Sequence, residues 1–400
     1  MHLNDSLGHL TYCTNIHAGE TWVEIFDGIR KNLPAVKAEL SPNAPLGLGL
    51  RLSAIAGEAL RDPAVFAEFE AFLKEGDYYI FTLNGFPYGT FHGQPVKEGA
   101  YRPDWSDPAR LNYTNTLADH LAKWLPEGME GSISTVPGTY KAWVTGSDGV
   151  DIISTIGDNI VRHVAHLVAI QNRTGKTINL ALEPEPSCLI ETIEETIGFY
   201  TSHLFSDRAI LLLEELTGLA ADEASDALHR HIGVCYDVCH AAVEFEDAKS
   251  SLDALKEAGI KISKLQLSSA LRIGEVNSDT ATQLGAMNEP IYMHQVIQNQ
   301  NGEITRFTDI PFALDTIDAA QGAEWRIHFH VPIFLEEMQD LGTTQQFLKD
   351  VLAIHKASPV TEQLEVETYT WDVLPDEYRR SGLSTMIARE LAWVRDQLTP

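Results

Sequence analysis

The chain alternates between short apolar runs and longer stretches in which apolar residues recur three or four positions apart. The short runs are typical of strands, and the longer spacing is typical of amphipathic helices, for example at 151–172, 191–216 and 344–357. Strands are predicted at residues 10–15, 46–52, 79–83, 131–136, 178–183, 232–237, 262–267 and 364–368. Eight strands separated by helices predict an α/β fold, a (β/α)8 TIM barrel, formed by a single domain over residues 1–400.

One segment interrupts this rhythm. An Asn-Gly pair at 301–302 lies between strand-like runs at 291–297 and 304–307, a pattern that predicts a β-hairpin. We therefore expect residues 272–333 to form an insertion near the seventh strand, at the C-terminal mouth of the barrel. Residues 325–334 form a ninth strand-like run, which either caps the mouth or replaces one of the eight strands.

Side chains on a strand alternate between its two faces, so the pattern indicates which residues point into the barrel. In the fifth strand, Leu180 and Leu182 share one face, which places Glu183 on the other. The same alternation places Asp237 and Glu367 inward at the ends of their strands. Because barrel enzymes carry their chemistry at the C-terminal ends of the strands, these three acids are the predicted centre of a site.

Carboxylates that converge inside a barrel need a compensating charge, because a buried unpaired ion is costly and like charges oppose each other's ionisation. We expect Glu183, Asp237 and Glu367 to bind a divalent metal ion, and ligand softness does not choose among Mn, Zn, Mg and Co. The alternative for each acid alone is a surface or salt-bridged residue. Glu365 fits that alternative better, since it lies deeper in its strand and faces inward Lys264.

Three histidines are further candidates. His240 follows Asp237 by three residues, which places it just above the metal and in reach of a bound hydroxyl. His328 and His330 lie two apart in an extended run, so they share a face, and a His-x-His strand is a metal-ligand signal. The alternative for each is a hydrogen-bonded core histidine. Polar residues near strand ends that are candidates for contacting a sugar-like substrate are His17, Asn84, His92, Glu185 and Arg272.

Composition and net charge limit the classes of molecule that the protein is expected to bind. Hydrophobic residues make up 44% of the chain and charged residues 22%, values typical of a globular protein. The 29 Lys and Arg against 57 Asp and Glu give a net charge of -28, which repels nucleic acid and favours a small-molecule substrate. No apolar run approaches the ~20 residues of a membrane span, so we expect a cytoplasmic protein without direct membrane insertion. The four cysteines are predicted to be reduced core residues.

Several strings of the sequence resemble a known superfamily, the xylose isomerase-like barrels, which include sugar and sugar-phosphate isomerases and epimerases. The resemblance lies in Leu182-Glu183-Pro184, Asp237-Val238-Cys239-His240, Gln266 followed by Arg272, and Val366-Glu367-Thr368. Over nearly the whole chain, the sequence more narrowly resembles the branch called metabolite traffic protein EboE. That likeness lies in Tyr12-Cys13-Thr14-Asn15-Ile16-His17, Leu83-Asn84-Gly85-Phe86-Pro87-Tyr88-Gly89 and Ser134-Thr135-Val136-Pro137-Gly138.

The broader resemblance implies one metal held by Glu, Asp, His and Glu on successive later strands, with the two glutamates also exchanging a proton with the substrate. Glu183, Asp237 and Glu367 match the first, second and fourth positions. Gln266 stands where the ketose epimerases carry the histidine, and His330 is the candidate replacement ligand. By the same resemblance, residues at substrate-contacting positions are His240, Arg272 and, with a different spacing, Glu191.

The leading functional hypothesis is a metal-dependent isomerase or epimerase of a sugar, sugar phosphate or cyclitol-like molecule. A non-catalytic metabolite-binding or carrier protein is the alternative that Gln266 keeps open. A metal-dependent phosphodiesterase or endonuclease is a second alternative, which the acidic charge opposes. The EboE resemblance implies a secondary-metabolite pathway with partners encoded in the same operon, and related barrels suggest a homo-oligomer by analogy.

Overall fold

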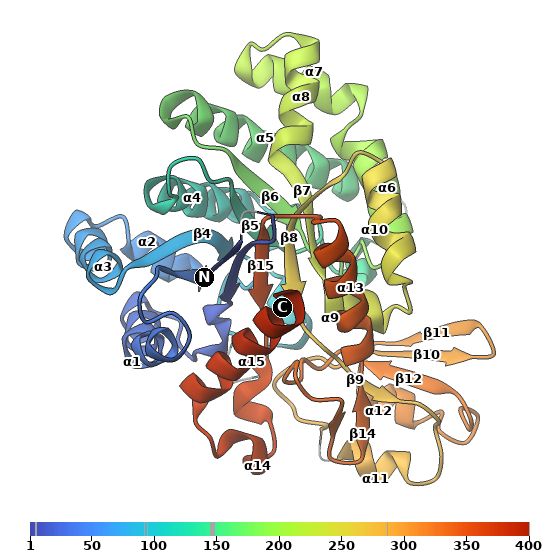
Figure 1. Ribbon diagram of the computed structural model, residues 1–400. Coiled ribbons are helices and arrows are strands. Elements are labelled where there is room, and N and C mark those ends of the chain that lie inside the picture. Colours follow the sequence, from blue (N-terminus) through green and yellow to red (C-terminus); the bar gives the residue numbers. More distant parts are fainter. Residues whose placement is uncertain (5, 92, 94, 145–148, 286, 400) are drawn as a thin grey trace.

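The computed structural model describes residues 1–400 except 5, 92, 94, 145–148, 286 and 400. Eight parallel strands form the centre of the molecule, and helices surround them (Figure 1). The strands are β2 (Gly8–Tyr12), β3 (Leu46–Arg51), β4 (Tyr78–Asn84), β5 (Gly131–Thr135), β6 (Ile178–Leu182), β7 (Ile232–Asp237), β8 (Lys261–Leu267) and β15 (Gln363–Val366). Each coincides with one predicted strand to within a few residues, so the predicted barrel is confirmed.

The strands follow the order β2-β15-β8-β7-β6-β5-β4-β3, with parallel pairing between neighbours. Side chains close the seam between β2 and β3. The Thr11 hydroxyl donates to the Gly47 carbonyl at 2.9 Å and accepts from the Gly49 N–H at 2.9 Å, and Cys13 bridges to Gly49. The eight strands therefore form a nearly closed barrel. A short strand, β1 (His2–Asn4), pairs antiparallel with β2.

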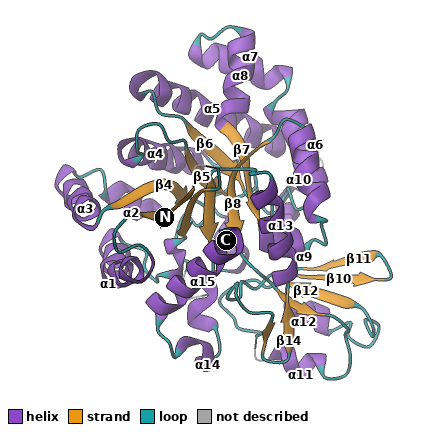
Figure 2. Ribbon diagram, viewed as in Figure 1, coloured by secondary structure: helices purple, strands orange, loops and turns teal. Residues whose placement is uncertain are grey.

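Amphipathic helices cover the outside of the barrel (Figure 2). Two predicted helices match α5 (Gly149–Thr174) and α13 (Gln345–Ala357). The others around the barrel are α1 (Trp22–Leu40), α2 (Ala54–Ala59), α3 (Pro63–Gly76), α4 (Pro108–Trp124), α6 (Ile193–Phe199), α7 (Asp207–Thr217), α8 (Ala221–His231), α9 (Val238–Val243), α10 (Ala248–Glu257), α14 (Asp376–Arg379) and α15 (Leu383–Leu398).

The prediction of one continuous helix over 191–216 is wrong. The segment divides into α6, a π-helical turn at Tyr200–Leu204, and α7. Ser206 explains the second boundary, because its extended backbone leaves the helix and its side chain accepts from the Ala209 N–H as an N-cap. Apolar periodicity does not detect such a break, since both pieces bury the same kind of face.

The insertion forms a second, six-stranded antiparallel sheet, seen at the lower right of Figures 1 and 2. The predicted hairpin is confirmed, with both turn residues, Asn301 and Gly302, at positive φ (57° and 91°). Within the run 325–334, only a short strand forms, and it joins the second sheet and leaves the barrel count at eight. This sheet and its two helices are β9 (Leu271–Ile273), β10 (Val296–Gln300), β11 (Glu303–Phe307), β12 (Glu324–Ile327), β13 (Glu337–Met338), β14 (Leu341–Thr343), α11 (Thr280–Gly285) and α12 (Ile310–Leu314). Because β13 and β14 belong to the sheet, it extends beyond residue 333, the predicted end of the insertion.

An ion pair occupies the inside of the barrel below its mouth. Lys264 Nζ lies 2.5 Å from Glu365 Oε2, both side chains are fully buried, and Ser134 Oγ lies 3.1 Å from the same ammonium. The predicted pairing of Glu365 is therefore confirmed. Gly49 makes room for this pair, because a Cβ at that position would lie 1.8 Å from Glu365 Oε1.

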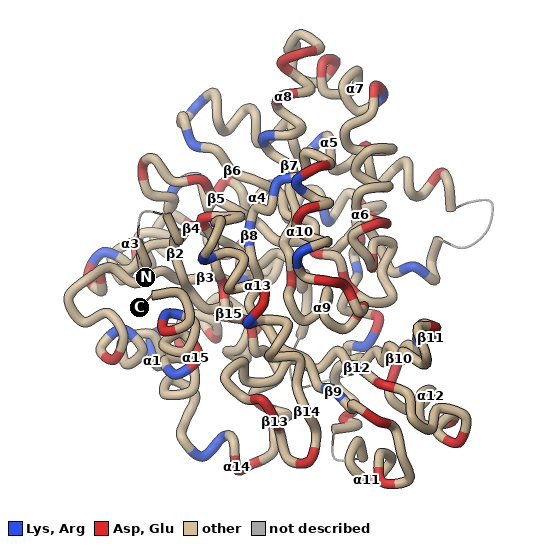
Figure 3. Tube along the Cα trace, turned by 45° about the vertical axis from the view of Figure 1, so that its right-hand side comes forward, with Lys and Arg blue, Asp and Glu red and all other residues tan. Residues whose placement is uncertain are grey.

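Acidic residues lie on many elements around the molecule, including α8, α10 and α14 (Figure 3). Figure 3 shows basic residues singly or in small groups between them. Among the helices built from described residues, none has the length and apolar content needed to cross a bilayer. The four cysteines are buried, as predicted for core residues.

Candidate metal centre

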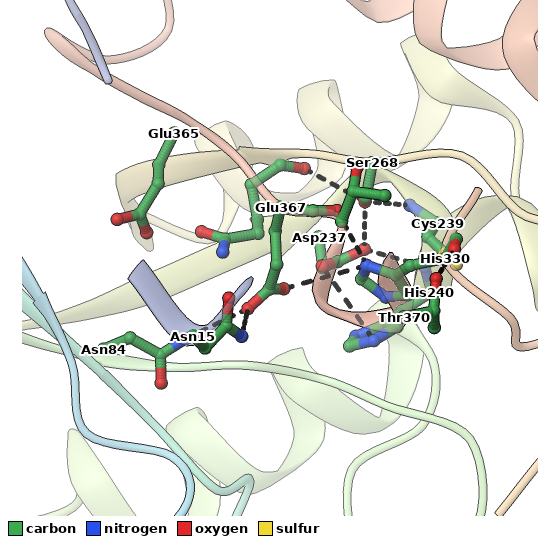
Figure 4. A network of polar contacts seen from close by, with 12 residues as sticks. Asn15, Asn84, Asp237, Cys239, His240, Ser268, His330, Glu365, Glu367 and Thr370 are labelled. Carbon is green, nitrogen blue, oxygen red and sulfur yellow. Dashed lines mark hydrogen bonds and ion pairs between the residues drawn. The ribbon is translucent and has the colours of Figure 1, made fainter. Parts of the chain in front are cut away.

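Three carboxylates meet at the C-terminal ends of three barrel strands. Glu183 follows β6, Asp237 ends β7 and Glu367 follows β15, and each offers an oxygen within 4.8 Å of the oxygens offered by the other two. All three residues are buried. The inward orientation expected from side-chain alternation therefore brings these acids together, and Figure 4 shows Asp237 and Glu367 directed toward the same space.

The chain supplies little positive charge to these acids. Burial, followed by the charges of Glu367 and Asp237, raises the pKa of Glu183 well above its ordinary value. Burial likewise raises the pKa of Glu367 to about 6, although His330 opposes the shift. Lys264 is the buried cation that lowers both, but it is already paired with Glu365.

The donor atoms fit a divalent cation. Glu183 Oε2, Asp237 Oδ2 and His330 Nε2 are buried and have no hydrogen-bond partner among the described residues. Glu183 groups with Asp237 and Glu367, and His330 groups with Asp237 and His240. Buried polar atoms are rarely left unpaired, so these atoms on two groups that share Asp237 indicate a partner from outside the chain. Carboxylate oxygens with one imidazole nitrogen form a donor set that Mn, Zn, Mg or Co accepts.

Glu367 is held from the N-terminal part of the barrel. Its Oε1 accepts from Asn15 Nδ2 at 2.6 Å and from Asn84 Nδ2 at 3.1 Å (Figure 4). Asn84 ends β4 and its own Oδ1 accepts from the Phe86 N–H at 3.1 Å, which fixes the orientation of the amide. These two amides leave Glu367 Oε2 directed toward His330, 3.9 Å from Nδ1.

Asp237 is fixed by its place at a strand-to-helix junction. It is the N-cap of α9, and its Oδ1 accepts from the His240 N–H at 3.1 Å. Ser268, just after β8, donates its hydroxyl to the same oxygen at 2.7 Å. The second oxygen, Oδ2, is thereby left for another partner, with His240 Nε2 3.9 Å away.

The three predicted histidines gather beside the carboxylates. His240 Nε2 lies 3.1 Å from His328 Nε2, and the ring of His330 stands 5.7 Å from that of His240. Their Nδ1 atoms contact the Pro184 carbonyl, Gln295 Oε1 and the Glu367 carbonyl, respectively, at 2.9–3.0 Å. Burial lowers the pKa of His240 to about 4, and the pKa of His328 falls well below its ordinary value for the same reason.

A pocket with about 560 Å³ of empty space opens above this cluster. Its polar lining includes Glu183, Glu367 and the three histidines, and its wall includes the aromatic rings of Phe86, Phe91, Tyr101, Tyr292 and Tyr369. Glu185 also lines it, where Tyr101 donates to Oε1 at 2.7 Å. Burial raises the pKa of Glu185 to about 8.

Asp237 borders a second, smaller pocket, and four other predicted residues do not line the main pocket either. Arg272 pairs with Glu324 on the exposed side of the second sheet, and His17 contacts the Tyr12 hydroxyl at 3.1 Å. Glu191 pairs with Lys141 and borders a separate small pocket behind Asp237.

The fourth is Gln266, which lies deeper in the barrel, with Oε1 3.9 Å from Cys235 Sγ. Its Nε2 has no hydrogen-bond partner among the described residues. His92, the remaining candidate, is outside the residues that the structure describes.

Sequence reasoning missed several residues that shape the site. Asn15 and Asn84 hold Glu367, Ser268 holds Asp237, and Gln295 and Tyr101 hold His328 and Glu185. Of these, only Asn84 was a candidate. Asn15 is the last residue of a predicted strand and Ser268 directly follows another, so position at a strand end was the signal that could have found them. Gln295 and Tyr101 come from loops, whose path apolar periodicity does not predict.

Neither a protein-family model nor a curated protein matches the chain. Similar solved structures include the probable 3-DHS dehydratase AsbF involved in petrobactin synthesis from Bacillus anthracis (10% identity, covering 96% of this chain and 97% of that one, TM-score 0.45). Others are an L-ribulose 3-epimerase (13%, 98% and 94%, 0.45) and the IolI protein with a binding zinc atom (11%, 98% and 98%, 0.44). Because these identities and TM-scores are low, the chemistry has to come from the residues of this chain.

Proposed function

We propose that this protein is a metal-dependent isomerase or epimerase of a small polyhydroxylated molecule, such as a sugar, a sugar phosphate or a cyclitol. The observation that carries the proposal is the convergence of Glu183, Asp237 and Glu367, the first and last of which line the pocket. Lys264, the buried cation nearest to them in the barrel, is already paired with Glu365. Glu183, Asp237 and Glu367 would hold the metal, with His330 as the candidate fourth donor.

The chemistry that a divalent cation supplies there is the polarisation of a substrate carbonyl or hydroxyl, which stabilises developing negative charge by several kcal/mol. The chain's own contribution is proton transfer. One of the two glutamates, Glu183 or Glu367, removes the proton from the carbon beside that group, and the other returns a proton to complete the rearrangement.

The residues around Glu367 support its proposed role in proton transfer. The Asn15 and Asn84 amides fix one oxygen of Glu367 and leave the other toward the pocket, so the carboxylate has a defined orientation for proton transfer. The aromatic wall, including Tyr292 and Tyr369, restricts water near the reacting carbon.

The test combines metal content with solvent exchange. Metal is measured by plasma mass spectrometry on untagged wild type and on Asp237→Ala, and a panel of ketoses, ketose phosphates and keto-cyclitols is incubated with each protein in D2O. We expect near-stoichiometric metal and deuterium incorporation at carbon for wild type, and loss of both in Asp237→Ala.

Glu183→Gln and Glu367→Gln are expected to abolish the exchange while the protein remains folded. Glu336→Gln, a surface carboxylate paired with Lys349, is the matched control. Full exchange in either active-site variant would overturn the assignment. Wild type that binds neither Mn nor Zn would instead favour a non-catalytic carrier.

We also propose membership of the EboE branch, with a role in a secondary-metabolite pathway, a cytoplasmic location and partners from the same operon. The support is that two of the EboE-like strings contain Asn15 and Asn84, the residues that hold Glu367. Deleting the gene should remove one product of the neighbouring pathway genes, measured by metabolite profiling. An unchanged profile would contradict this placement.

A further inference from the structure

The three histidines beside the carboxylates each have a defined tautomer. His240 Nδ1 lies 2.9 Å from the Pro184 carbonyl and His330 Nδ1 lies 3.0 Å from the Glu367 carbonyl. A carbonyl oxygen only accepts hydrogen bonds, so both Nδ1 atoms carry the hydrogen. In the neutral imidazoles, Nε2 of His240 and of His330 is therefore a lone pair directed away from these carbonyls.

The tautomer of His328 follows from the orientation of one amide. Gln295 Nε2 lies 2.9 Å from the Pro186 carbonyl and 3.1 Å from the Tyr101 hydroxyl. Because the Pro186 carbonyl needs a donor, the amide nitrogen must face it, and Gln295 Oε1 must then face His328 Nδ1 at 2.9 Å. His328 Nδ1 is thus the donor, and its Nε2 is a lone pair as well.

These assignments leave two lone pairs facing each other. His240 Nε2 and His328 Nε2 are 3.1 Å apart, and neither carries a hydrogen in the neutral form. At this separation no water molecule fits between the two nitrogen atoms. Two acceptors at hydrogen-bond distance repel each other unless a positive species is bound between or beside them. Imidazoles fixed through Nδ1 to a carbonyl or amide oxygen are the arrangement that metal-ligating histidines adopt.

A carboxylate completes the group. Glu185 offers an oxygen within 4.8 Å of ligand atoms of both His240 and His328, and Tyr101 holds its Oε1 by a 2.7 Å hydrogen bond. We propose that Glu185, His240 and His328 bind a second divalent cation, of the zinc or cobalt class, next to the three-carboxylate site. The two sets, Glu185, His240 and His328 on one hand and Glu183, Asp237 and Glu367 on the other, share no residue.

The two ligand sets differ in their donor atoms, so their metal preferences should differ. Imidazole nitrogens favour zinc and cobalt, whereas an all-carboxylate set also accepts manganese and magnesium. His330 lies between them, since it groups with Asp237 and His240. This second cation goes beyond the proposed isomerase chemistry and does not depend on it.

Chelator-stripped full-length protein is titrated with Zn²⁺, and the bound metal is counted by plasma mass spectrometry after desalting. We expect two equivalents per chain in wild type. His328→Gln should keep one equivalent, and so should Glu183→Gln, because each variant removes a ligand from only one set. A double variant should keep none. The affinity of the histidine site for Zn²⁺ should fall more than about 100-fold in His328→Gln. Losing a residue that only orients a ligand typically lowers metal affinity by about 10–100-fold, so the larger loss would identify His328 as a ligand.

His240→Gln removes another ligand of the same site, from a different element of the fold. Agreement between His240→Gln and His328→Gln would show that the loss of zinc is not due to a folding defect in one variant. His166→Gln is the matched control, because His166 contacts Asp119 on the surface and should leave both equivalents in place. Circular dichroism checks that each variant is folded.

The outcomes separate this inference from the proposed function. If wild type binds a single zinc per chain that is lost in Glu183→Gln and kept in His328→Gln, the second site is overturned and the isomerase proposal is not affected. The two histidines would then share a proton between their Nε2 atoms. A single equivalent with the opposite pattern would support the histidine site and overturn the carboxylate centre.

Discussion

Glu365 lies on β15 and Glu367 lies just after its end, two residues further along the chain. Both point into the same barrel, yet their surroundings differ. Glu365 contacts Lys264, its own buried cation, at 2.5 Å. Glu367 is held by two neutral amides and has two other carboxylates nearby. The chain balances its charge in the lower part of the barrel and leaves it unbalanced at the mouth. An unbalanced buried charge lowers stability, so the mouth is where we propose that a cation from solution binds.

The largest effect should come from breaking the balanced region. Lys264→Met leaves Glu365 buried without its cation, and we expect the free energy of unfolding to fall by about 3–5 kcal/mol. Urea unfolding followed by circular dichroism measures it. Lys249→Met, at an exposed pair with Asp253, is the control and should change stability little. A loss in Lys264→Met as small as in the control would contradict the comparison.

Glu390 sharpens the comparison, because it is a buried carboxyl with only neutral donors. It accepts from the Thr368 hydroxyl at 2.7 Å and the Ile333 N–H at 3.1 Å, and burial raises its pKa to about 7. The folded state therefore binds this proton more tightly than the unfolded state. No penalty exists below the unfolded pKa near 4.5, and the folded state loses stability as the pH rises toward 7.

Glu390→Gln cannot ionise, so it should gain stability relative to wild type across that pH window, by about 3 kcal/mol at its upper end. Denaturant unfolding of both proteins at pH 4.5, 6 and 7.5 measures the difference. A difference that stays constant with pH would contradict the raised pKa.

Adding a divalent cation should stabilise the protein by neutralising the three carboxylates at the mouth of the barrel. At a Zn²⁺ or Mn²⁺ concentration of 100 times Kd, wild type should gain about 2.7 kcal/mol in the free energy of unfolding. Asp237→Asn keeps the shape of the site and loses one negative charge, so its gain should be much smaller. Thermal unfolding with and without metal gives the answer, and equal gains in both proteins would place the cation elsewhere.

The smallest effect concerns the metal-free protein. Removing one of the crowded carboxylates in Glu183→Gln relieves repulsion and a buried charge, and we expect stability to rise by about 1 kcal/mol without metal. Chemical unfolding in the presence of a chelator measures it. The same substitution should lower stability when metal is present, and this change of sign distinguishes a metal site from a structural cluster.

Much of the fold could be predicted from the sequence because barrel strands carry a strong signal. Strands such as β7 are short, apolar and bounded by turns, and alternation along them correctly placed Asp237 and Glu183 in one cluster. The Lys264–Glu365 pair followed from the same rule, as two inward charges of opposite sign. These predictions depend only on local geometry.

The rest depends on contacts between distant segments. Arg272 was expected near the substrate, but β9 turns it toward Glu324, because the second sheet sets the direction of that strand. Gln295 orients His328 from a different part of the insertion. Such contacts come from the path of loops and from sheet pairing at long range, which alternation along one strand does not encode.

The hydrogen bond between Asn15 and Glu367 joins residues 352 positions apart. During synthesis, the N-terminal two thirds of the chain therefore emerges from the ribosome without Glu367, His328 or His330, and no such fragment contains a complete centre. A metal held at the proposed centre would therefore require the eighth strand to be in the barrel, so its binding would follow most of the folding of the chain and would not guide it.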